Sequence, residues 1–395
     1  MPYRPLVGVI AGLALLLFGY SAILRAGSYG TLGVSPRSAA DSAAYLPFVM
    51  KQVPTAPTPT VTITPAVTFT ATISPTPTTP PVATATSIPG GYTYYLTGDP
   101  ANAQTSTEAG LMLMGGGEDV DAAFTWLIDK SGGGDVVVLR ASGSDGYNHY
   151  IYHELGGVDS VETLVIRQRF AAYDPFVLSK VQNAEALFIA GGDQWDYVSR
   201  WKGTPLEAAI HDLASQEVPI GGTSAGLAIL GEFFFSAQNG TVYSDEALAD
   251  PYNHYMTLDR EFLMLPHLDG VITDSHFFER DRMGRLIAFL ARISQDGWAS
   301  DVKGIGINEE TAVLIEADGN ATLVGSGAAY FLRTTAPPQL CQPNTPLTLL
   351  DVQLYRLFAG ASFNLATWTG SGGTAYQISA TGGVLSSTQP SGGLY

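Results

Sequence analysis

Cysteine and basic residues are both scarce in this chain of 395 residues. The one cysteine, Cys341, leaves no intrachain disulfide bond to form and no Cys-x-x-Cys metal site. Only 19 lysines and arginines stand against 36 aspartates and glutamates, a net charge of −17. Nucleic-acid binding needs clustered basic residues, so this composition argues against it. The six histidines show no His-Glu-x-x-His spacing, whereas 46% hydrophobic residues allow a large core.

Charge is absent from the segment between Leu6 and Leu24, which follows Arg4. Its length is close to the roughly 20 apolar residues that span a bilayer. The segment is also compatible with a secretory signal peptide, and the sequence leaves both readings open. In either case we expect residues 1–25 to direct the chain out of the cytoplasm, as a secreted or a membrane-anchored protein.

The next segment is poor in everything except threonine, proline, alanine and valine, from about residue 53 to residue 89. Such a composition cannot bury enough apolar surface to offset the entropy of ordering. We therefore expect residues 26–90 to be a disordered stalk. Residues 336–395 differ again, with short alternating runs separated by glycine and serine, which predict a small β-rich C-terminal extension.

Between these segments, residues 91–335 alternate short apolar runs with segments of helical period. Such alternation predicts an α/β fold in three layers, with a mostly parallel sheet covered on both faces. In such sheets, ligands bind at the carboxyl ends of the strands. The expected strands lie within 110–119 (strand, then a glycine turn), 134–143, 162–167, 185–194, 268–277, 304–317 and 321–327, and the expected helices in 120–130, 175–184, 205–216 and 281–294.

A glycine-rich turn around Ser224 is the first candidate for chemistry. The run Gly222-Thr223-Ser224-Ala225-Gly226 has the form G-x-S-x-G and lies between an apolar strand and a helical segment. In that context the motif marks a nucleophile elbow, whose strained serine requires very small neighbours. A plain glycine-rich turn is the alternative reading of the same residues.

A serine needs a base, and the base needs a carboxylate that orients it. His276 lies just beyond the strand expected at 269–273, at the same sheet edge as Ser224. His149 and His153 lie in a tyrosine-rich stretch that is compatible with simple packing. Glu309, at another strand end, is our choice of carboxylate, and Glu310 remains an alternative.

Further candidates surround these three. The loop 190–194 provides Gly192, whose backbone N–H is expected to hold an oxyanion together with that of Ala225. Asp193 and Gln194 in the same loop are expected to bind substrate. Three arginines, Arg280, Arg282 and Arg285, form a basic cluster in an acidic chain. We expect one or two of them to pair with structural carboxylates and another to meet a substrate carboxylate, although a solvated helix start would look the same.

Five blocks in order together resemble the cyanophycinase and aspartyl dipeptidase family of serine peptidases. The blocks are GGGED (115–119), GGDQ (191–194), GGTSAG (221–226), DSHFFERDRMGRL (274–286) and GIGINEETA (304–312). The resemblance implies a flavodoxin-like sheet of the class I glutamine amidotransferase type, with serine in place of cysteine as nucleophile. It also implies a Ser224–His276–Glu309 triad, homodimers, and no metal or organic cofactor.

The sequence therefore predicts an exported serine peptidase that cleaves aspartyl or isoaspartyl bonds, such as β-Asp-Arg, through an acyl-enzyme. Two departures bear on the substrate: Ser275 stands where the family has glutamine, and Asn308 where it has aspartate. The Thr/Pro stalk and the C-terminal extension have no counterpart in the minimal enzyme. A non-catalytic cell-surface binding module is the alternative, and a glutaminase is disfavoured because that chemistry uses a cysteine at position 224.

Overall fold

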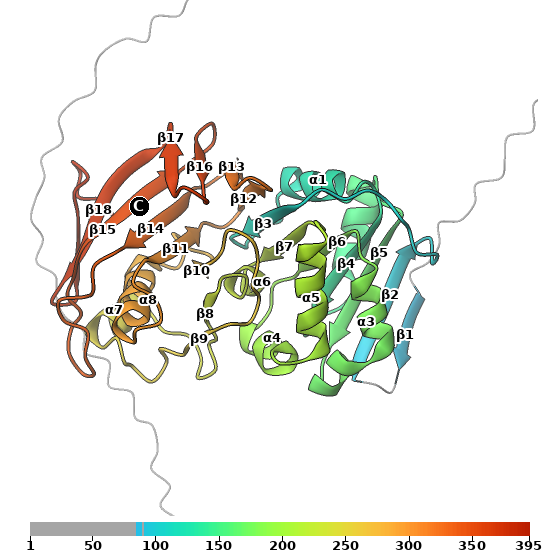
Figure 1. The fold of residues 1–395 in the computed structure, drawn as a ribbon, viewed down its shortest axis with the longest axis horizontal. Coiled ribbons are helices and arrows are strands. Elements are labelled where there is room, and N and C mark those ends of the chain that lie inside the picture. Colours follow the sequence, from blue (N-terminus) through green and yellow to red (C-terminus); the bar gives the residue numbers. More distant parts are fainter. Residues whose placement is uncertain (1–83, 89–90) are drawn as a thin grey trace, which may run out of the picture. The chain divides into compact units, whose positions relative to one another are not determined.

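A computed structural model describes residues 84–88 and 91–395, which form two β-sheets with helices packed against them (Figure 1). The predicted export segment and most of the predicted stalk lie outside the described residues. β1 (Thr84–Ile88) falls inside the range predicted as stalk and pairs antiparallel with β2 (Tyr92–Gly98). Across the described part of the chain, the structure has no helix long and apolar enough to cross a membrane.

The first sheet has eleven strands around a parallel core. Five adjacent strands, β5, β4, β6, β7 and β3, run parallel, and antiparallel neighbours flank them on both sides. The prediction of a mostly parallel sheet holds for this core, whereas the complete sheet is mixed. After β1 and β2, its strands in spatial order are β5 (Ser160–Ile166), β4 (Asp135–Arg140), β6 (Ala186–Ile189), β7 (Ile220–Thr223), β3 (Gly110–Met114), β12 (Thr311–Glu316), β13 (Asn320–Gly325), β16 (Ser362–Asn364) and β17 (Thr369–Ser371).

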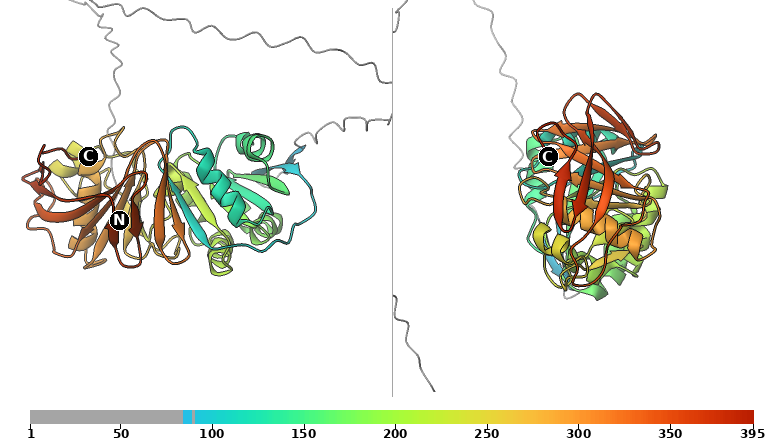
Figure 2. Two further views of the ribbon diagram at one scale, coloured as in Figure 1. Left: turned by 90° about the horizontal axis from the view of Figure 1, so that it is seen from above. Right: turned by 90° about the vertical axis from the view of Figure 1, so that its left-hand side faces the viewer.

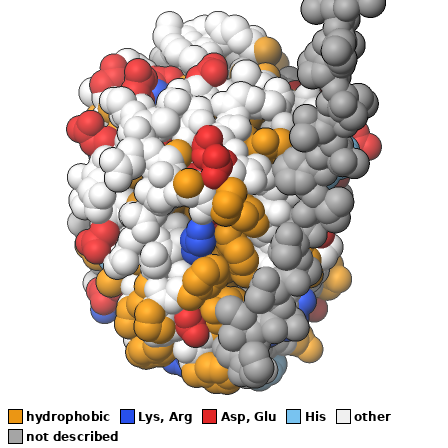
Figure 3. Space-filling model, turned by 90° about the vertical axis from the view of Figure 1, so that its right-hand side faces the viewer, with side chains coloured by type: hydrophobic (Ala, Val, Ile, Leu, Met, Phe, Trp, Pro, Cys, Tyr) orange, Lys and Arg blue, Asp and Glu red, His pale blue; other side chains and the backbone are white. Residues whose placement is uncertain are grey.

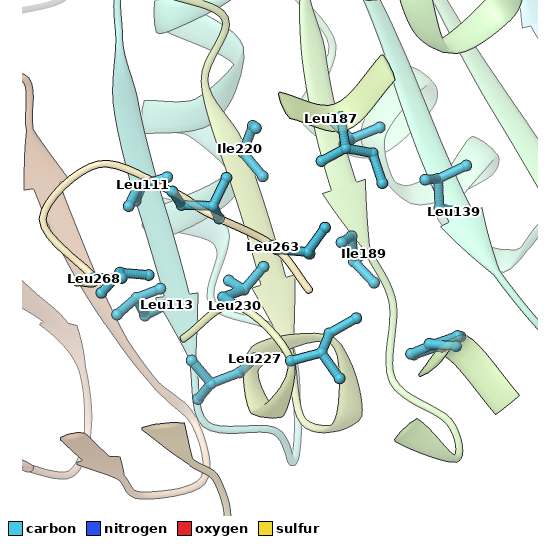
Figure 4. Close-up of a cluster of buried hydrophobic side chains, with 14 of the residues drawn as sticks. Leu111, Leu113, Leu139, Leu187, Ile189, Ile220, Leu227, Leu230, Leu263 and Leu268 are labelled. Carbon is cyan, nitrogen blue, oxygen red and sulfur yellow. The ribbon is translucent and has the colours of Figure 1, made fainter. Parts of the chain in front are cut away.

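Both faces of this parallel core are buried. Alternate residues of each strand point to opposite sides of the sheet, so each strand contributes to an apolar cluster on either side. Leu111 and Leu113 of β3 join the cluster that Figure 4 shows, together with leucines and isoleucines from neighbouring strands. Met112 and Met114 of the same strand join a second cluster with Phe124 on the opposite face. The continuous apolar runs of the sequence thus correspond to strands covered on both sides.

Helices supply that cover on both faces, as Figures 1 and 2 show. Helix α1 packs on the face of Met112 and Met114, and its buried apolar residues belong to the same cluster. Helices α3 and α5 pack on the opposite face. Both α3 and α5 begin with a proline, which suits the first helical turn because its missing N–H has no partner there. The helices are α1 (Asp121–Lys130), α2 (Gly146–His149), α3 (Pro175–Gln182), α4 (Gln194–Trp201), α5 (Pro205–Ser215), α6 (Ala225–Ala228), α7 (Ser244–Ala249) and α8 (Met283–Gln295).

The second sheet has eight strands and is also mixed. Only β8, β10 and β11 run parallel to one another, and all other pairings in it are antiparallel. One face packs against α8, and residues of the other face, such as Ile305 and Phe331, join the core of the first sheet. Its strands in spatial order are β19 (Val384–Ser387), β18 (Thr374–Thr381), β15 (Leu349–Leu357), β14 (Ala329–Thr334), β11 (Val302–Ile307), β10 (Val271–Asp274), β8 (Phe233–Phe235) and β9 (Leu258–Arg260).

Two sequence expectations change in this part of the molecule. The single strand expected over 304–317 is two strands, β11 and β12, which belong to different sheets. The chain turns between them at residues 308–310, where Glu310 adopts a left-handed backbone (φ 52°) that no strand continues through. The C-terminal residues form strands, and these extend both sheets: β15, β18 and β19 join the second, β16 and β17 the first.

Far from β7 and β3 along the first sheet, the end of the sheet at β2 and its outer neighbour β1 carries exposed apolar surface (Figure 3). Figure 3 shows hydrophobic side chains gathered on that side of the molecule. At this edge Tyr94 packs edge-on against Phe176, with the Lys180 ammonium over both rings. The polar candidate residues of the sequence do not lie here but at the carboxyl ends of the central strands.

Candidate active site

Four strand ends meet where the two sheets adjoin. β3 and β7 are parallel neighbours in the first sheet, and β10 and β11 are parallel neighbours in the second. The segments that follow these four strands carry the glycines 115–117, Ser224, His276 and Glu309 respectively. Because carboxyl ends of parallel strands lie at one edge, residues distant in sequence come together here.

Ser224 occupies the sharp turn from β7 into α6. Its backbone is strained, with φ 53° and ψ −112°, a region that costs free energy for any residue with a side chain. The flanking glycines make room for the turn: a Cβ at Gly222 would lie 2.8 Å from the carbonyl carbon of Gly226. A Cβ at Gly226 would collide with the carbonyl oxygen of Ile189. The structure therefore has the strained nucleophile-elbow geometry that the G-x-S-x-G motif predicts, not a plain turn.

The three residues chosen from the sequence lie in one continuous hydrogen-bonded line. Ser224 Oγ is 2.7 Å from His276 Nε2, and His276 Nδ1 is 2.5 Å from Glu309 Oε1. Glu310 points elsewhere, with Oε2 accepting a hydrogen bond from the Ser326 hydroxyl. Of the two glutamates that the sequence left open, Glu309 is therefore the one whose carboxylate contacts the imidazole.

The surroundings of the histidine in this line favour its neutral form. His276 is 7% exposed, and burial lowers its pKa below the ordinary value of 6.5. The hydrogen bond that Nδ1 donates to Glu309 opposes this effect, whereas the positive charges of Arg280 and Arg282 add to it, and the net shift of the pKa is downward. A neutral imidazole with Nδ1–H directed at the carboxylate has Nε2 free to accept the serine proton.

A run of three glycines after β3 ties the three segments together. Backbone carbonyls of Met114, Gly115 and Gly116 accept hydrogen bonds from the N–H groups of Ser224 (3.1 Å), His276 (2.8 Å) and Glu310 (2.8 Å). Three consecutive carbonyls, from the end of β3 and the first two glycines, thus bond to the segments that carry Ser224, His276 and Glu309.

Side chains would not fit in this loop. A Cβ at Gly116 would lie 2.6 Å from His276 Nε2, and one at Gly117 would lie 2.8 Å from Glu309 Cβ. Both glycines also have positive φ, 99° and 80°. The sequence predicts a glycine turn here and shows a resemblance to a family block, but neither predicts these contacts. The signal for this loop was available as three successive glycines at the end of an expected strand.

Two of the three clustered arginines, Arg282 and Arg285, bind the buried Asp274. Arg285 makes two hydrogen bonds to Asp274, Nε to Oδ2 at 2.7 Å and Nη2 to Oδ1 at 2.5 Å. Arg282 donates to the Ser275 carbonyl (2.7 Å) and to Asp274 (3.3 Å), and burial lowers its pKa to about 10. Burial opposes ionisation of Asp274, but Arg285 and then Arg282 hold the pKa of this carboxyl below its usual value. The exposed Arg280 is the remaining member.

A pocket of about 360 Å³ lies beside the serine. Arg280 lines both this pocket and the smaller recess that contains Ser224 and His276, so the two spaces adjoin. Gln194 also lines both, and its amide donates to the Phe235 carbonyl at 3.4 Å. Asp193 lines the pocket while its carboxylate caps α4 by accepting from the Trp195 N–H at 2.9 Å.

The two expected oxyanion donors border the same recess. Ala225 follows the serine and is the first residue of α6, where a helical N–H has no partner within its helix. Gly192 lines the recess together with Ser224. The Ser224 N–H is already engaged with Met114, so it is not available to an oxyanion.

Other histidines make their contacts away from Ser224. His149 Nδ1 lies 3.0 Å from Glu154 at the surface, and its ring contacts that of His153. His211 Nε2 lies 2.9 Å from the Phe262 carbonyl oxygen. The histidine brought to the serine is therefore His276.

A hydroxyl, an imidazole and a carboxylate in one hydrogen-bonded line at a strand-to-helix turn are the arrangement of serine hydrolases. The sequence also matches the family model of peptidase family S51 over residues 111–323. The chain therefore belongs to peptidase family S51, and it is a serine-type peptidase.

Several proteins are similar to this chain. The cyanophycinase of Synechococcus elongatus is 28% identical over 287 residues, covering 68% of this chain and 84% of the relative. The cyanophycinase of Trichormus variabilis is 29% identical over 220 residues, covering 54% and 68%. Among solved structures, a peptidase from an acI-B1 actinobacterium aligns with a TM-score of 0.46 and 18% identity, covering 66% of this chain and 98% of that one. The chain is thus a distant homologue of cyanophycinases.

Proposed function

We propose that this protein is an exported peptidase of cyanophycinase type that cleaves aspartyl or isoaspartyl peptide bonds, such as β-Asp-Arg. The observation that carries the proposal is the line from Ser224 Oγ through His276 to Glu309. The cyanophycinase homologues support the substrate class, because cyanophycinase is what those relatives are named.

In the proposed first step, Ser224 Oγ attacks the carbonyl carbon of the scissile bond while His276 Nε2 takes the hydroxyl proton. Glu309 stabilises the resulting imidazolium through Nδ1. The N–H groups of Ala225 and Gly192 stabilise the oxyanion that forms on the carbonyl oxygen.

The intermediate then collapses to an acyl-enzyme. The C–N bond breaks, the His276 proton passes to the leaving amine, and the acyl group stays on Ser224 as an ester. Water, deprotonated by His276, attacks that ester and releases the carboxylate product with the free serine.

The charges around the pocket fit a substrate that carries both signs. Arg280 is exposed at the junction of the pocket and the serine recess, so it is proposed to bind a substrate carboxylate. Asp193 at the pocket wall and Gln194 beside it are proposed to bind the basic side chain. Arg282 and Arg285 act as substrate-binding residues mainly by shaping the wall, because Asp274 holds their guanidinium groups.

The remaining expectations complete the proposal. Residues 1–25 export the chain or anchor it in a membrane, residues 26–90 are mainly a stalk, and residues 91–335 are the peptidase domain. Its fold is proposed to be of the class I glutamine amidotransferase type, with residues 336–395 as a β-rich extension. Homodimers without a metal or organic cofactor are proposed, and the substrate is a peptide.

The decisive experiment incubates the full-length protein with cyanophycin and with β- and α-linked aspartyl dipeptides, and identifies products by mass spectrometry. The proposal predicts cleavage of the β-linked substrates by the wild type and a loss on the order of 10⁴-fold or more in Ser224→Ala. Cleavage restricted to α-linked dipeptides would reject the isoaspartyl specificity. No cleavage, together with saturable peptide binding, would favour a non-catalytic binding module.

A further inference from the structure

The last residues of the sequence reach the loop that carries the base. The loop between β10 and α8, residues 275–282, contains His276, Arg280 and Arg282. Tyr395 lies against this loop with its ring close to those of Phe277 (5.9 Å) and Phe278 (5.2 Å). A segment from the C-terminal extension therefore touches residues that are neighbours in sequence of the pocket-lining Arg280 and Arg282.

The Tyr395 hydroxyl makes two hydrogen bonds with the end of this loop. It donates to Asp281 Oδ1 at 2.8 Å and accepts from the Met283 N–H at 3.0 Å. Met283 is the first residue of α8, so its N–H has no acceptor within the helix. The Tyr395 hydroxyl thus provides an acceptor for the Met283 N–H and also binds the Asp281 carboxylate.

The loop needs such support because its backbone is strained. His276 and Asp281 both adopt positive φ, 45° and 46°, which a residue with a side chain keeps only when its surroundings enforce it. Asp281 is held from a second side, where its carbonyl accepts a hydrogen bond from the Ser244 hydroxyl at the start of α7. The loop is therefore fixed between α7 and the C-terminal segment.

The C-terminal segment is itself anchored to the second sheet. The Leu394 carbonyl accepts from the Tyr376 hydroxyl of β18 at 3.0 Å, and the Gly393 carbonyl accepts from the Gln389 amide at 2.8 Å. Leu394 and Tyr395 also pack against the core beneath α8. These contacts connect β18 to the active-site loop through three residues.

We propose that Tyr395 is a positioning residue for this active site. Its hydroxyl and ring hold the 275–282 loop in the conformation that places His276 Nε2 against Ser224 and Arg280 at the pocket. Tyr395 does not touch the reacting atoms; it acts through the loop. This inference rests on the proposed role of Ser224 as nucleophile, and it gives the C-terminal extension a part in catalysis.

The test compares Tyr395→Phe with a matched control, Tyr252→Phe. Phenylalanine keeps the ring contacts at position 395 and removes only the hydroxyl. Tyr252 donates an equivalent hydrogen bond to Asp296, at 2.8 Å, just beyond the opposite end of α8. Both variants of the full-length protein are measured in two ways: by the rate of Ser224 labelling with a fluorophosphonate, and by amide hydrogen exchange of peptides spanning residues 275–283.

We expect Tyr395→Phe to exchange faster in these peptides and to be labelled about tenfold more slowly, as the loss of a hydrogen bond to a carboxylate predicts. Tyr252→Phe should match the wild type in both. Equal slowing in both variants, or faster exchange with unchanged labelling, would overturn the positioning role. Unchanged exchange would overturn it even if labelling slowed.

Hydrogen exchange also separates this inference from the proposed function. If the wild type takes no label, the nucleophile proposal fails, and the exchange of residues 275–283 still decides whether Tyr395 holds the loop. A protected loop in the wild type that opens in Tyr395→Phe alone would then support the positioning; equal protection in all three proteins would end it.

Discussion

The two sheets make different contributions to the candidate active site. The parallel core of the first sheet provides Ser224 from β7 and the glycine loop from β3, while the second provides His276 and the arginines from the segment after β10. Glu309 lies on the short connection that passes from β11 of the second sheet to β12 of the first. Ser224 and His276 therefore come from different sheets.

This difference shows where the geometry is controlled. Neither sheet alone holds both members of the pair, so the distance between Ser224 Oγ and His276 Nε2 depends on how the sheets are joined. The carbonyls of residues 114–116 provide that join, because they bond to the serine, histidine and glutamate segments at once. Substitutions in the segments that connect the two sheets should therefore lower activity more than substitutions on the surface of either sheet.

The largest effect is expected for the connection between the sheets. Glu309→Gln removes the charge that stabilises the imidazolium, and hydrolysis should fall by about 10³- to 10⁴-fold. Glu310→Gln is the matched control on the same turn and should stay within about threefold of wild type, because its carboxylate faces Ser326. Steady-state rates on a cleaved peptide measure both, and a reversed order would assign the carboxylate role to Glu310.

The next largest effect is a loss of stability on changing the buried ion pair of the second sheet. Asp274→Asn leaves the buried Arg285 without its ion-pair partner, so the free energy of unfolding should fall by about 3–5 kcal/mol. Asp301→Asn disrupts the more exposed pair with Arg333 and should cost no more than about 1 kcal/mol. Urea denaturation measures both. Equal losses would show that burial of the Asp274 pair does not matter.

A smaller effect on activity is expected in the glycine loop after β3, which bonds to both sheets. Gly116→Ala places a Cβ 2.6 Å from His276 Nε2, and the resulting displacement of the ring should lower activity about a hundredfold. Gly297→Ala has a similar positive φ, 71°, but an added Cβ there meets no atom within 4 Å. It should lose about 1 kcal/mol of stability and little activity. Full activity in Gly116→Ala would contradict the tight packing of the loop on the imidazole.

The smallest effect is a shift in pH dependence. Only neutral His276 accepts the serine proton, so hydrolysis should rise with pH and level off above its pKa. Burial lowers that pKa, which places the midpoint of the rise below 6.5. Glu309 raises the pKa, so the residual activity of Glu309→Gln should rise at a still lower pH. A midpoint above 6.5 in the wild type would contradict this account of the histidine's surroundings.

Much of the first sheet and its site could be predicted from the sequence, for a physical reason. The strands of the parallel core are buried on both faces and therefore appear as continuous apolar runs, and their carboxyl ends appear as clusters of glycine and polar residues. Ser224 follows such a run in the first sheet, and His276 and Glu309 follow the similarly buried runs of β10 and β11 in the second. The G-x-S-x-G spacing reports a local steric need, which is why the elbow was predictable.

The second sheet was much harder to predict. A run such as 304–317 looks the same whether it forms one strand or two in different sheets, because the turn depends on the backbone of Glu310 and not on a glycine or proline. The pairing of Arg285 with Asp274 and the contact of Tyr395 with the active-site loop join residues that no local pattern connects. Such contacts follow from tertiary packing.

The central claim is that Ser224 is a nucleophile activated by a histidine from the other sheet. The most direct measurement treats the full-length wild type and His276→Ala with a fluorophosphonate and maps the adduct by peptide mass spectrometry. The account predicts an adduct on Ser224 in the wild type and essentially none in the variant. An adduct on another residue, or equal labelling of Ser224 in both proteins, would contradict it.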